Sequence, residues 1–306
     1  MAFESRLRRS LLFVPGDAER KLDRAVTAGA DTLILDLEDA VAPDQKDRAR
    51  GEVAYRIRSG FFRASEVAVR INARGTEFFE ADLASIVMAG ARLLMIPKTE
   101  SAEGIEAVAR AVAQHESAGV SDPVRLLALV ETALGVAQLG SFSRRKRVPG
   151  TILRRTDRLD GLCFGNADFS LDMGIGDGNL SGGIVYHARC NLAIAAVAAG
   201  VIPIDGVCLT AKDEDAFRNE SEQAVRLGFE GKLCIHPSQV PIANEVFTPT
   251  RHQIRAARRV VDAWRAASAN GQGVIWLDGK MVDAPQAAIQ ARILERARRA
   301  GALSEA

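Results

Sequence analysis

Short apolar segments rich in valine, isoleucine and leucine recur along the chain, and each is followed by a stretch of helical periodicity. The apolar segments do not alternate with polar residues, which is typical of parallel strands covered on both faces. We predict strands at Ser10–Val14, Thr32–Leu37, Val67–Ile71, Leu93–Ile96, Arg125–Val130, Gly161–Phe164, Gly206–Leu209 and Lys232–Ile235. Predicted helices between them include Asp17–Ala28, Ser101–Gln114, Tyr186–Ala199 and Asp213–Leu227. Eight strand–helix units favour an α/β fold, a (β/α)8 TIM barrel, over an open doubly wound sheet.

The chain beyond His236 departs from this alternation. It predicts, in order, a helix at Pro249–Ala267, strands at Val274–Trp276 and Lys280–Val282 around an Asp278–Gly279 hairpin turn, and a helix at Pro285–Ala300. These segments hold too few apolar residues for a core of their own. We therefore expect a barrel domain at 1–238 and a lid or oligomerisation extension at 239–306.

Composition narrows the class of partner. Lys and Arg number 40 and Asp and Glu 39, so the net charge is only +1, which argues against nucleic acid or an anionic membrane as the main partner. No apolar run has the length of a membrane span, and the N-terminus lacks the pattern of a signal peptide. The four cysteines have no metal-type spacing and are expected to be free thiols. These features predict a cytoplasmic soluble protein.

Carboxylates gather where the predicted strands end. The carboxyl ends of barrel strands converge on one mouth, so these side chains should meet there. They are Asp36, Glu38, Asp39, Glu131 and Asp168. Carboxylates at close quarters repel one another, and a bound cation relieves the repulsion. Oxygen ligands without a matching His or Cys indicate Mg²⁺ or Mn²⁺, and the alternative is a set of salt bridges with Arg70 and Lys98.

Arg70 is the arginine at the inner end of a predicted strand. Its planar guanidinium suits bidentate binding of a carboxylate. A metal and an arginine together fit a substrate with a 2-oxo or 2-hydroxy acid group. The metal would chelate the carboxylate and the neighbouring oxygen, and Arg70 would hold the remaining carboxylate oxygen.

Several stretches in order along the chain resemble one known family. They are RSLLFVPG (Arg9–Gly16), GADTLILDLEDAV (Gly29–Val41), VRIN (Val69–Asn72), IPKTES (Ile96–Ser101), ETALGV (Glu131–Val136), LDGLCFGNADFSLDMG (Leu159–Gly174), GFEGKLCIHPSQV (Gly228–Val240) and DGKMVDAP (Asp278–Pro285). The chain resembles the citrate lyase β-subunit and malyl-CoA lyase family, within the HpcH/HpaI-type Mg²⁺-dependent aldolases. The resemblance covers essentially the whole chain.

The resemblance implies roles for residues at matching positions. Glu131 and Asp168 would be the protein ligands of Mg²⁺, and Arg70 together with Glu131 would bind the substrate. Coenzyme A, as part of the substrate, would lie over the barrel mouth. The matching contact residues are Phe13, Lys21, His236 and Pro237.

The resemblance also gives the extension a role. In this family an acid from the tail of an adjacent subunit lies over the active site, and the matching residue is Asp283 in DGKMVDAP. This implies a homotrimer or hexamer that exchanges lids between subunits, with Arg70, Glu131 and Asp283 as the catalytic residues.

The implied reaction is cleavage of a 3-hydroxy-dicarboxylyl-CoA, such as malyl-CoA or citramalyl-CoA, to acetyl-CoA and a 2-oxo acid. The alternatives are a citrate lyase β-subunit acting on citryl-acyl-carrier protein in a multi-subunit complex, a malyl-CoA thioesterase, and a non-catalytic scaffold. Three features depart from the family pattern. They are a long basic stretch at Ser141–Arg158, a predicted seventh strand that ends in Leu209–Thr210–Ala211 where an aspartate often stands, and the segment QAAIQA after Pro285. They leave the substrate open.

Overall fold

The fold was analysed in a computed structural model of the chain, which describes residues 7–62, 65–116, 122–142, 157–176 and 182–303. The chain divides into two compact units. One comprises Arg8–Asn244, and the other comprises Glu245–Ala306 together with the N-terminal Met1–Leu7.

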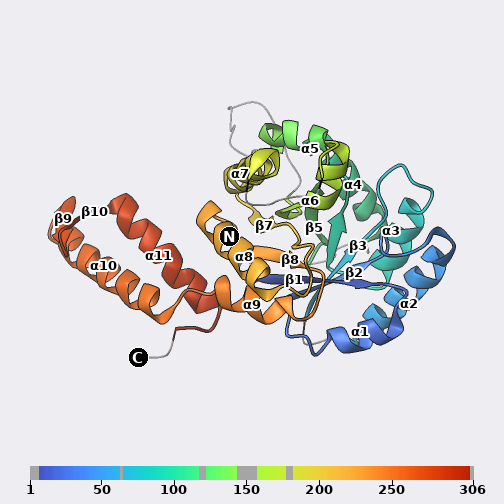
Figure 1. Cartoon of the computed structure of the whole chain (residues 1–306), viewed down its shortest axis with the longest axis horizontal. Coiled ribbons are helices and arrows are strands. Elements are labelled where there is room, and N and C mark those ends of the chain that lie inside the picture. Colours follow the sequence, from blue (N-terminus) through green and yellow to red (C-terminus); the bar gives the residue numbers. More distant parts are fainter. Residues whose placement is uncertain (1–6, 63–64, 117–121, 143–156, 177–181, 304–306) are drawn as a thin grey trace. The chain divides into compact units, whose positions relative to one another are not determined.

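The first unit is a closed barrel in which each parallel strand pairs with the next along the chain and β1 pairs with β8. The strands are β1 (Ser10–Pro15), β2 (Thr32–Asp36), β3 (Glu66–Arg70), β4 (Leu93–Ile96), β5 (Arg125–Val130), β6 (Leu159–Phe164), β7 (Ile202–Asp205) and β8 (Gly231–Cys234). Figure 1 shows these strands surrounded by helices. The predicted TIM barrel is confirmed.

Helices α1 to α8 lie between the barrel strands along the chain, and α9 follows the last strand. They are α1 (Glu19–Ala25), α2 (Lys46–Arg58), α3 (Phe79–Met88), α4 (Ala102–His115), α5 (Ala133–Ala137), α6 (Asn166–Asp172), α7 (Gly183–Ala199), α8 (Glu214–Leu227) and α9 (Gln239–Val246), with 3-10 turns η1 (Pro43–Gln45) and η2 (Leu139–Phe142). Side-chain caps define several starts, since Ser101 and Asp213 accept backbone N–H bonds at the first turns of α4 and α8. Gly200 and Gly228 end α7 and α8 in the left-handed conformation.

The predicted position of the seventh strand was wrong. β7 spans Ile202–Asp205 instead of Gly206–Leu209. Pro203 and Asp205 make this segment unlike a buried strand in sequence, because proline lacks a ladder donor and a carboxylate is costly to bury. Arg189 and Lys232 neutralise Asp205, at 2.9 Å each. The strand therefore ends at Asp205, four residues before the predicted end at Leu209.

The barrel interior is an apolar core. Its buried members are Leu11, Ile34, Ala68, Leu93, Met95, Leu127, Leu129, Cys163, Ile202, Ile204 and Leu233, with Phe13 and Val207 packed against them. At the amino-terminal end of the barrel, Arg8 pairs with Glu66 at 2.7 Å and with Asp160 at 3.0 Å. These ion pairs close the end of the barrel opposite the carboxyl ends of the strands.

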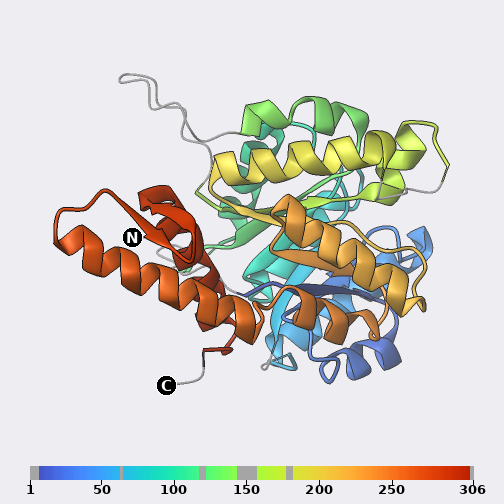
Figure 2. The same ribbon diagram turned by 60° about the vertical axis from the view of Figure 1, so that its left-hand side comes forward.

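The second unit consists of two helices joined by a hairpin. Its elements are α10 (Arg251–Ala269), β9 (Val274–Leu277), β10 (Lys280–Asp283) and α11 (Ala284–Arg299). Figure 2 shows α10 lying alongside α11. Asp278 and Gly279 form the turn with positive φ, as expected from the sequence. On the hairpin, Trp276 faces its cross-strand partner Met281, and both side chains are exposed.

The structure can be compared with three further expectations, on the basic stretch, the cysteines and membrane spans. Most of the basic stretch Ser141–Arg158 lies outside the described residues, and Arg158 at its end pairs with Glu116 at 2.6 Å. All four cysteines are free thiols, and three of them are buried. Within the described ranges, no helix combines the length and the apolar character that crossing a membrane requires.

Candidate active site

The side chains at the barrel mouth continue the inward-facing rows of the strands. Side chains alternate between the two faces of a strand, so Asp36 follows Ile34 and Glu131 follows Leu129 on the interior side. Arg70 follows Ala68 in the same way and is the register partner of Asp36. The barrel therefore places three charged side chains on top of its apolar core.

Arg70 is fixed by a salt bridge to Asp36. Its Nε and Nη2 donate to the two carboxylate oxygens of Asp36 at 2.7 and 2.6 Å. Burial would lower the pKa of Arg70, but the hydrogen bonds and charge of Asp36 outweigh it and raise the pKa. The guanidinium also lies over the ring of Phe13, 4.9 Å from the ring centroid.

Two further carboxylates lie at the Nη1 end of Arg70. Glu38 Oε2 lies 3.0 Å from Nη1 as an ion pair without hydrogen-bond geometry, and Asp39 Oδ2 accepts from Nη1 at 3.3 Å. The Glu38 side chain is buried, whereas that of Asp39 is 56% exposed. Burial raises the pKa of Glu38 to about 7, although the charge of Arg70 opposes this shift.

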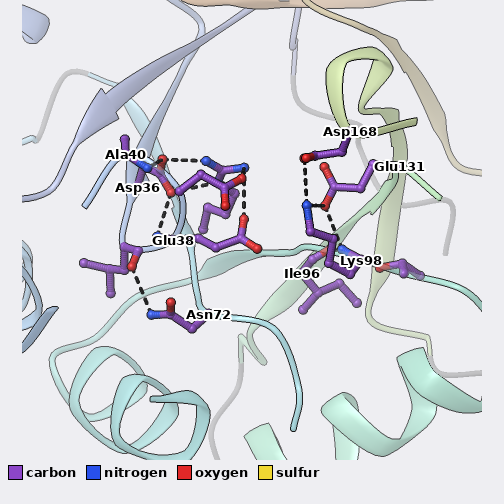
Figure 3. Close-up of polar contacts among 12 residues, drawn as sticks. Asp36, Glu38, Ala40, Asn72, Ile96, Lys98, Glu131 and Asp168 are labelled. Atoms are coloured by element: carbon purple, nitrogen blue, oxygen red, sulfur yellow. Dashed lines mark hydrogen bonds and ion pairs between the residues drawn. The ribbon is translucent and has the colours of Figure 1, made fainter. Parts of the chain in front are cut away.

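Glu131 and Asp168 form a second group with Lys98 (Figure 3). Lys98 Nζ lies 2.7 Å from Asp168 Oδ2 and 3.6 Å from Glu131 Oε1. The backbone N–H of Lys98 donates to the same Glu131 oxygen at 2.8 Å. Burial raises the pKa of Glu131 to about 8, whereas hydrogen bonding from Lys98 overcomes burial at Asp168 and lowers its pKa.

A glycine allows this close approach. Gly165 precedes α6, and a Cβ added there would come within 2.6 Å of Glu131 Oε2. Asn166, the next residue, exchanges two hydrogen bonds with the backbone of Val207 at 2.9 and 3.1 Å. These contacts hold the first turn of α6, and with it Asp168, beside Glu131.

A cavity of about 700 Å³ opens at the barrel mouth. It is lined by most of the residues that the sequence singled out, namely Phe13, Lys21, Arg70, Glu131, Asp168, His236 and Pro237. Asp283 belongs to the other unit, where its carboxylate accepts from Gln286 N at 3.0 Å and caps α11. The barrel thus brings the predicted metal, substrate and coenzyme residues to one cavity.

The charges at this mouth suit a divalent cation. Five carboxylates lie against the two cations Arg70 and Lys98, which leaves three negative charges in excess when all are ionised. Among the described residues, no group of three or more His, Cys, Asp or Glu side chains is arranged to hold a metal. Mg²⁺ needs no such cage, because it usually binds one or two carboxylates and keeps waters. Glu131 and Asp168 fit that pattern.

The sequence did not show the place of two residues, Lys98 and Arg24, in this site. Lys98 was one rim residue among several, and only the fold shows that it spans Glu131 and Asp168. Arg24 lines the cavity with Lys21, one helical turn earlier on α1. The i, i+3 spacing of these two basic residues was the available signal.

Comparison with known proteins places this site in a family context. Residues 9–237 match the sequence profile described as HpcH/HpaI aldolase/citrate lyase. The chain is 34% identical to citrate lyase subunit beta of Haemophilus influenzae, covering 96% of this chain and 98% of that protein. It is 35% identical to a (3S)-malyl-CoA thioesterase of Cereibacter sphaeroides, covering 92% of each.

A solved structure is also similar to this chain. The protein CitE from Mycobacterium tuberculosis, crystallised in complex with magnesium, acetoacetate and coenzyme A, superposes with a TM-score of 0.73 at 30% identity. The match covers 94% of this chain and 97% of that one.

Proposed function

The chain belongs to the HpcH/HpaI aldolase/citrate lyase family, and from this premise we propose that it is a Mg²⁺-dependent lyase that cleaves a 3-hydroxy-dicarboxylyl-CoA thioester. The products would be acetyl-CoA and a 2-oxo acid, from a substrate of the malyl-CoA or citramalyl-CoA type. The expectation of a carbon–carbon lyase is confirmed at the level of the family. The substrate is the proposal.

One observation carries this proposal: Glu131 and Asp168 line the same cavity as Arg70. The two carboxylates would hold Mg²⁺, and the CitE structure with magnesium and acetoacetate supports that choice of metal. When bound, Mg²⁺ supplies a Lewis acid that polarises the carbonyl of the 2-oxo acid, worth several kcal/mol. Arg70 would bind the carboxylate of the same group.

The geometry suggests how Arg70 accepts a substrate. Asp36 holds the Nε and Nη2 edge, so the orientation of the guanidinium is set before substrate arrives. Asp39 is the exposed and more distant partner, at 3.3 Å from Nη1. A substrate carboxylate would replace Asp39 there, because that exchange breaks the weakest of the three ion pairs.

The coenzyme would lie at the outer part of the cavity. Lys21 and Arg24 on α1 are exposed cations that suit the phosphates of coenzyme A. Phe13, His236 and Pro237 line the same cavity and would pack against the thioester arm.

Cleavage requires a proton to leave the hydroxyl and another to reach the thioester enolate. Asp283, supplied by a neighbouring copy, would be the acid that gives the second proton. In its own chain Asp283 ends β10 on a hairpin whose Trp276 and Met281 are exposed, which suits contact with another subunit. We therefore propose a homotrimer or hexamer with lid exchange.

Two alternative outcomes have support among relatives. The Haemophilus influenzae relative is a citrate lyase subunit beta, which favours action on citryl-acyl-carrier protein within a complex. The Cereibacter sphaeroides relative is a malyl-CoA thioesterase, which favours hydrolysis at the same site. A non-catalytic scaffold is the least favoured reading, because the charged residues of the site are all present.

The test is an assay of the purified protein with Mg²⁺ and a panel of thioesters, following two products at once. Cleavage releases a 2-oxo acid without a free thiol, so a carbonyl reagent responds and a thiol reagent does not. A thioesterase that acts on the intact thioester gives the reverse result. Activity only with citryl-acyl-carrier protein would support the citrate lyase β-subunit, and no activity with any of these substrates would contradict the proposal.

A further inference from the structure

Lys98 has an unusual backbone at the centre of the site. Its φ is +47°, and among the described residues only Lys98 and Asp278, in the hairpin turn, have positive φ without being glycine. This conformation is costly for a lysine and tends to persist where the surroundings require it. Here it directs the backbone N–H of Lys98 at Glu131 Oε1, 2.8 Å away.

The side chain of Lys98 occupies the position of a cation. Its Nζ spans the two proposed metal ligands, at 2.7 Å from Asp168 and 3.6 Å from Glu131. An ammonium group between Glu131 and Asp168 and a divalent cation bound to the same two carboxylates would repel each other at this distance. The side chains of Lys98 and Asp168 are each about one-third exposed, so water can replace their contact at low cost.

A second cavity gives Lys98 a place to go. It has a volume of about 220 Å³, enough for several water molecules. Lys98 lines it together with Asn72, Thr99 and Glu100. The ammonium group can therefore leave Asp168 and remain hydrated beside polar side chains.

We propose that Lys98 is the resident counter-ion of the metal site: it holds Glu131 and Asp168 together without a divalent cation and moves into the 220 Å³ cavity when one binds. This inference rests on the proposed function in one respect, that Glu131 and Asp168 are the metal ligands. The backbone N–H keeps Glu131 in place throughout. Lys98 is thus a positioning residue that tunes metal affinity.

The experiment measures Mg²⁺ binding by the full chain with calorimetry and melting. Lys98→Met removes the competing ammonium, so the Kd for Mg²⁺ falls about tenfold, which is within the usual range of coupling between two ligands of one site. The metal-free variant melts at a lower temperature, and added Mg²⁺ raises its melting temperature more than that of the wild type. Lys98→Asn is the second variant, because asparagine tolerates positive φ and its side chain does not reach Asp168.

The control is Arg92→Met. Arg92 precedes the same strand at its opposite end and pairs loosely with Asp122 at 3.9 Å. This variant removes one positive charge and should leave the Kd within twofold. Direct evidence of displacement comes from acetylation of Lys98 by acetic anhydride, which should become several-fold faster with saturating Mg²⁺.

The outcomes separate the two proposals. Mg²⁺ binding by the wild type, with an unchanged or higher Kd in both Lys98 variants, would overturn the role of Lys98 alone. Slower or unchanged acetylation of Lys98 with Mg²⁺ would also overturn it. Mg²⁺ binding by neither wild type nor variants would overturn the metal site and the counter-ion together.

Discussion

Asp36 and Arg70 are register partners on adjacent strands, and the carboxylate of Asp36 accepts two hydrogen bonds from the guanidinium of Arg70. Asp36 also accepts the backbone N–H groups of Glu38 and Ala40 at 2.9 and 3.1 Å. One buried carboxylate therefore orients the proposed substrate-binding arginine and shapes the loop after β2. Because of this dual role, substitution of Asp36 tests the proposed function of the site.

We predict that Asp36→Asn lowers both stability and activity. Removing one partner of a buried ion pair leaves the other charge uncompensated, and a loss of about 3 kcal/mol in the free energy of unfolding is expected. Arg70 would lose its fixed orientation, so KM for the thioester should rise at least tenfold. Urea unfolding and steady-state kinetics measure the two effects. Asp39→Asn is the matched control, because its exposed ion pair should contribute less than about 1 kcal/mol.

We predict that Glu131→Gln removes the stabilisation by Mg²⁺. A ligand at one hundred times its Kd stabilises the folded state by about 2.7 kcal/mol, so the wild type should melt at a higher temperature with Mg²⁺ than with a chelator. The variant, with one proposed ligand replaced, should melt at the same temperature in both, and its activity should fall at least a hundredfold. Equal stabilisation of the two proteins by Mg²⁺ would exclude Glu131 as a ligand.

The raised pKa of Glu38 predicts a pH dependence of stability. Burial raises the pKa of this carboxyl from its usual 4.5 to about 7, so the folded chain holds a proton that the unfolded chain has lost in that window. Its contribution to stability is therefore complete below pH 4.5 and is lost as the pH rises through 7. The charged groups that act on Glu38 include Asp36, Asp39, Arg70 and Lys98, and Lys46 and Glu131 also interact with its charge.

Glu38→Gln should remove this dependence. Between pH 5 and pH 8 the wild type should lose about 2 to 3 kcal/mol more than the variant, given about 1.4 kcal/mol for each unit of pKa shift. Urea unfolding at the two pH values measures the difference. Glu103→Gln, which changes an exposed carboxylate in the first turn of α4, serves as the control and should keep the wild-type dependence. Parallel profiles of wild type and Glu38→Gln would contradict the prediction.

We predict that Gly165→Ala damages the site with little loss of fold. The added Cβ would collide with the Glu131 side chain, which would have to move away from Lys98 and Asp168. Activity and Mg²⁺ affinity should each fall at least tenfold, as measured by kinetics and calorimetry. Gly51→Ala, in the middle of α2 with open space around its Cβ position, is the control and should stabilise the chain by about 0.5 to 1 kcal/mol.

The sequence by itself determined the barrel and the row of charges at its mouth. Continuous apolar segments and helical periodicity are local properties, so the barrel strands other than β7 were placed within two residues of their ends. The two-residue period of a strand likewise fixed which side chains share the interior face with Leu129 and Ile34. The position of β7 was not predicted, because Pro203 and Asp205 are unusual in a buried strand. Asp205 is accommodated there by ion pairs with residues remote in sequence.

Only the tertiary structure decided how those charges are shared. From the sequence, any of the five carboxylates at the strand ends could have paired with Arg70 or with Lys98. The sequence could not assign each carboxylate to one of these two cations. In the fold, strand register pairs Asp36 with Arg70. Lys98, after β4, pairs with Glu131, after β5, and with Asp168 in the first turn of α6. The physical reason is that an ion pair depends on the distance between two side chains and on their burial, and these residues lie far apart along the chain. Hydrophobic periodicity reports only on residues that are close in sequence.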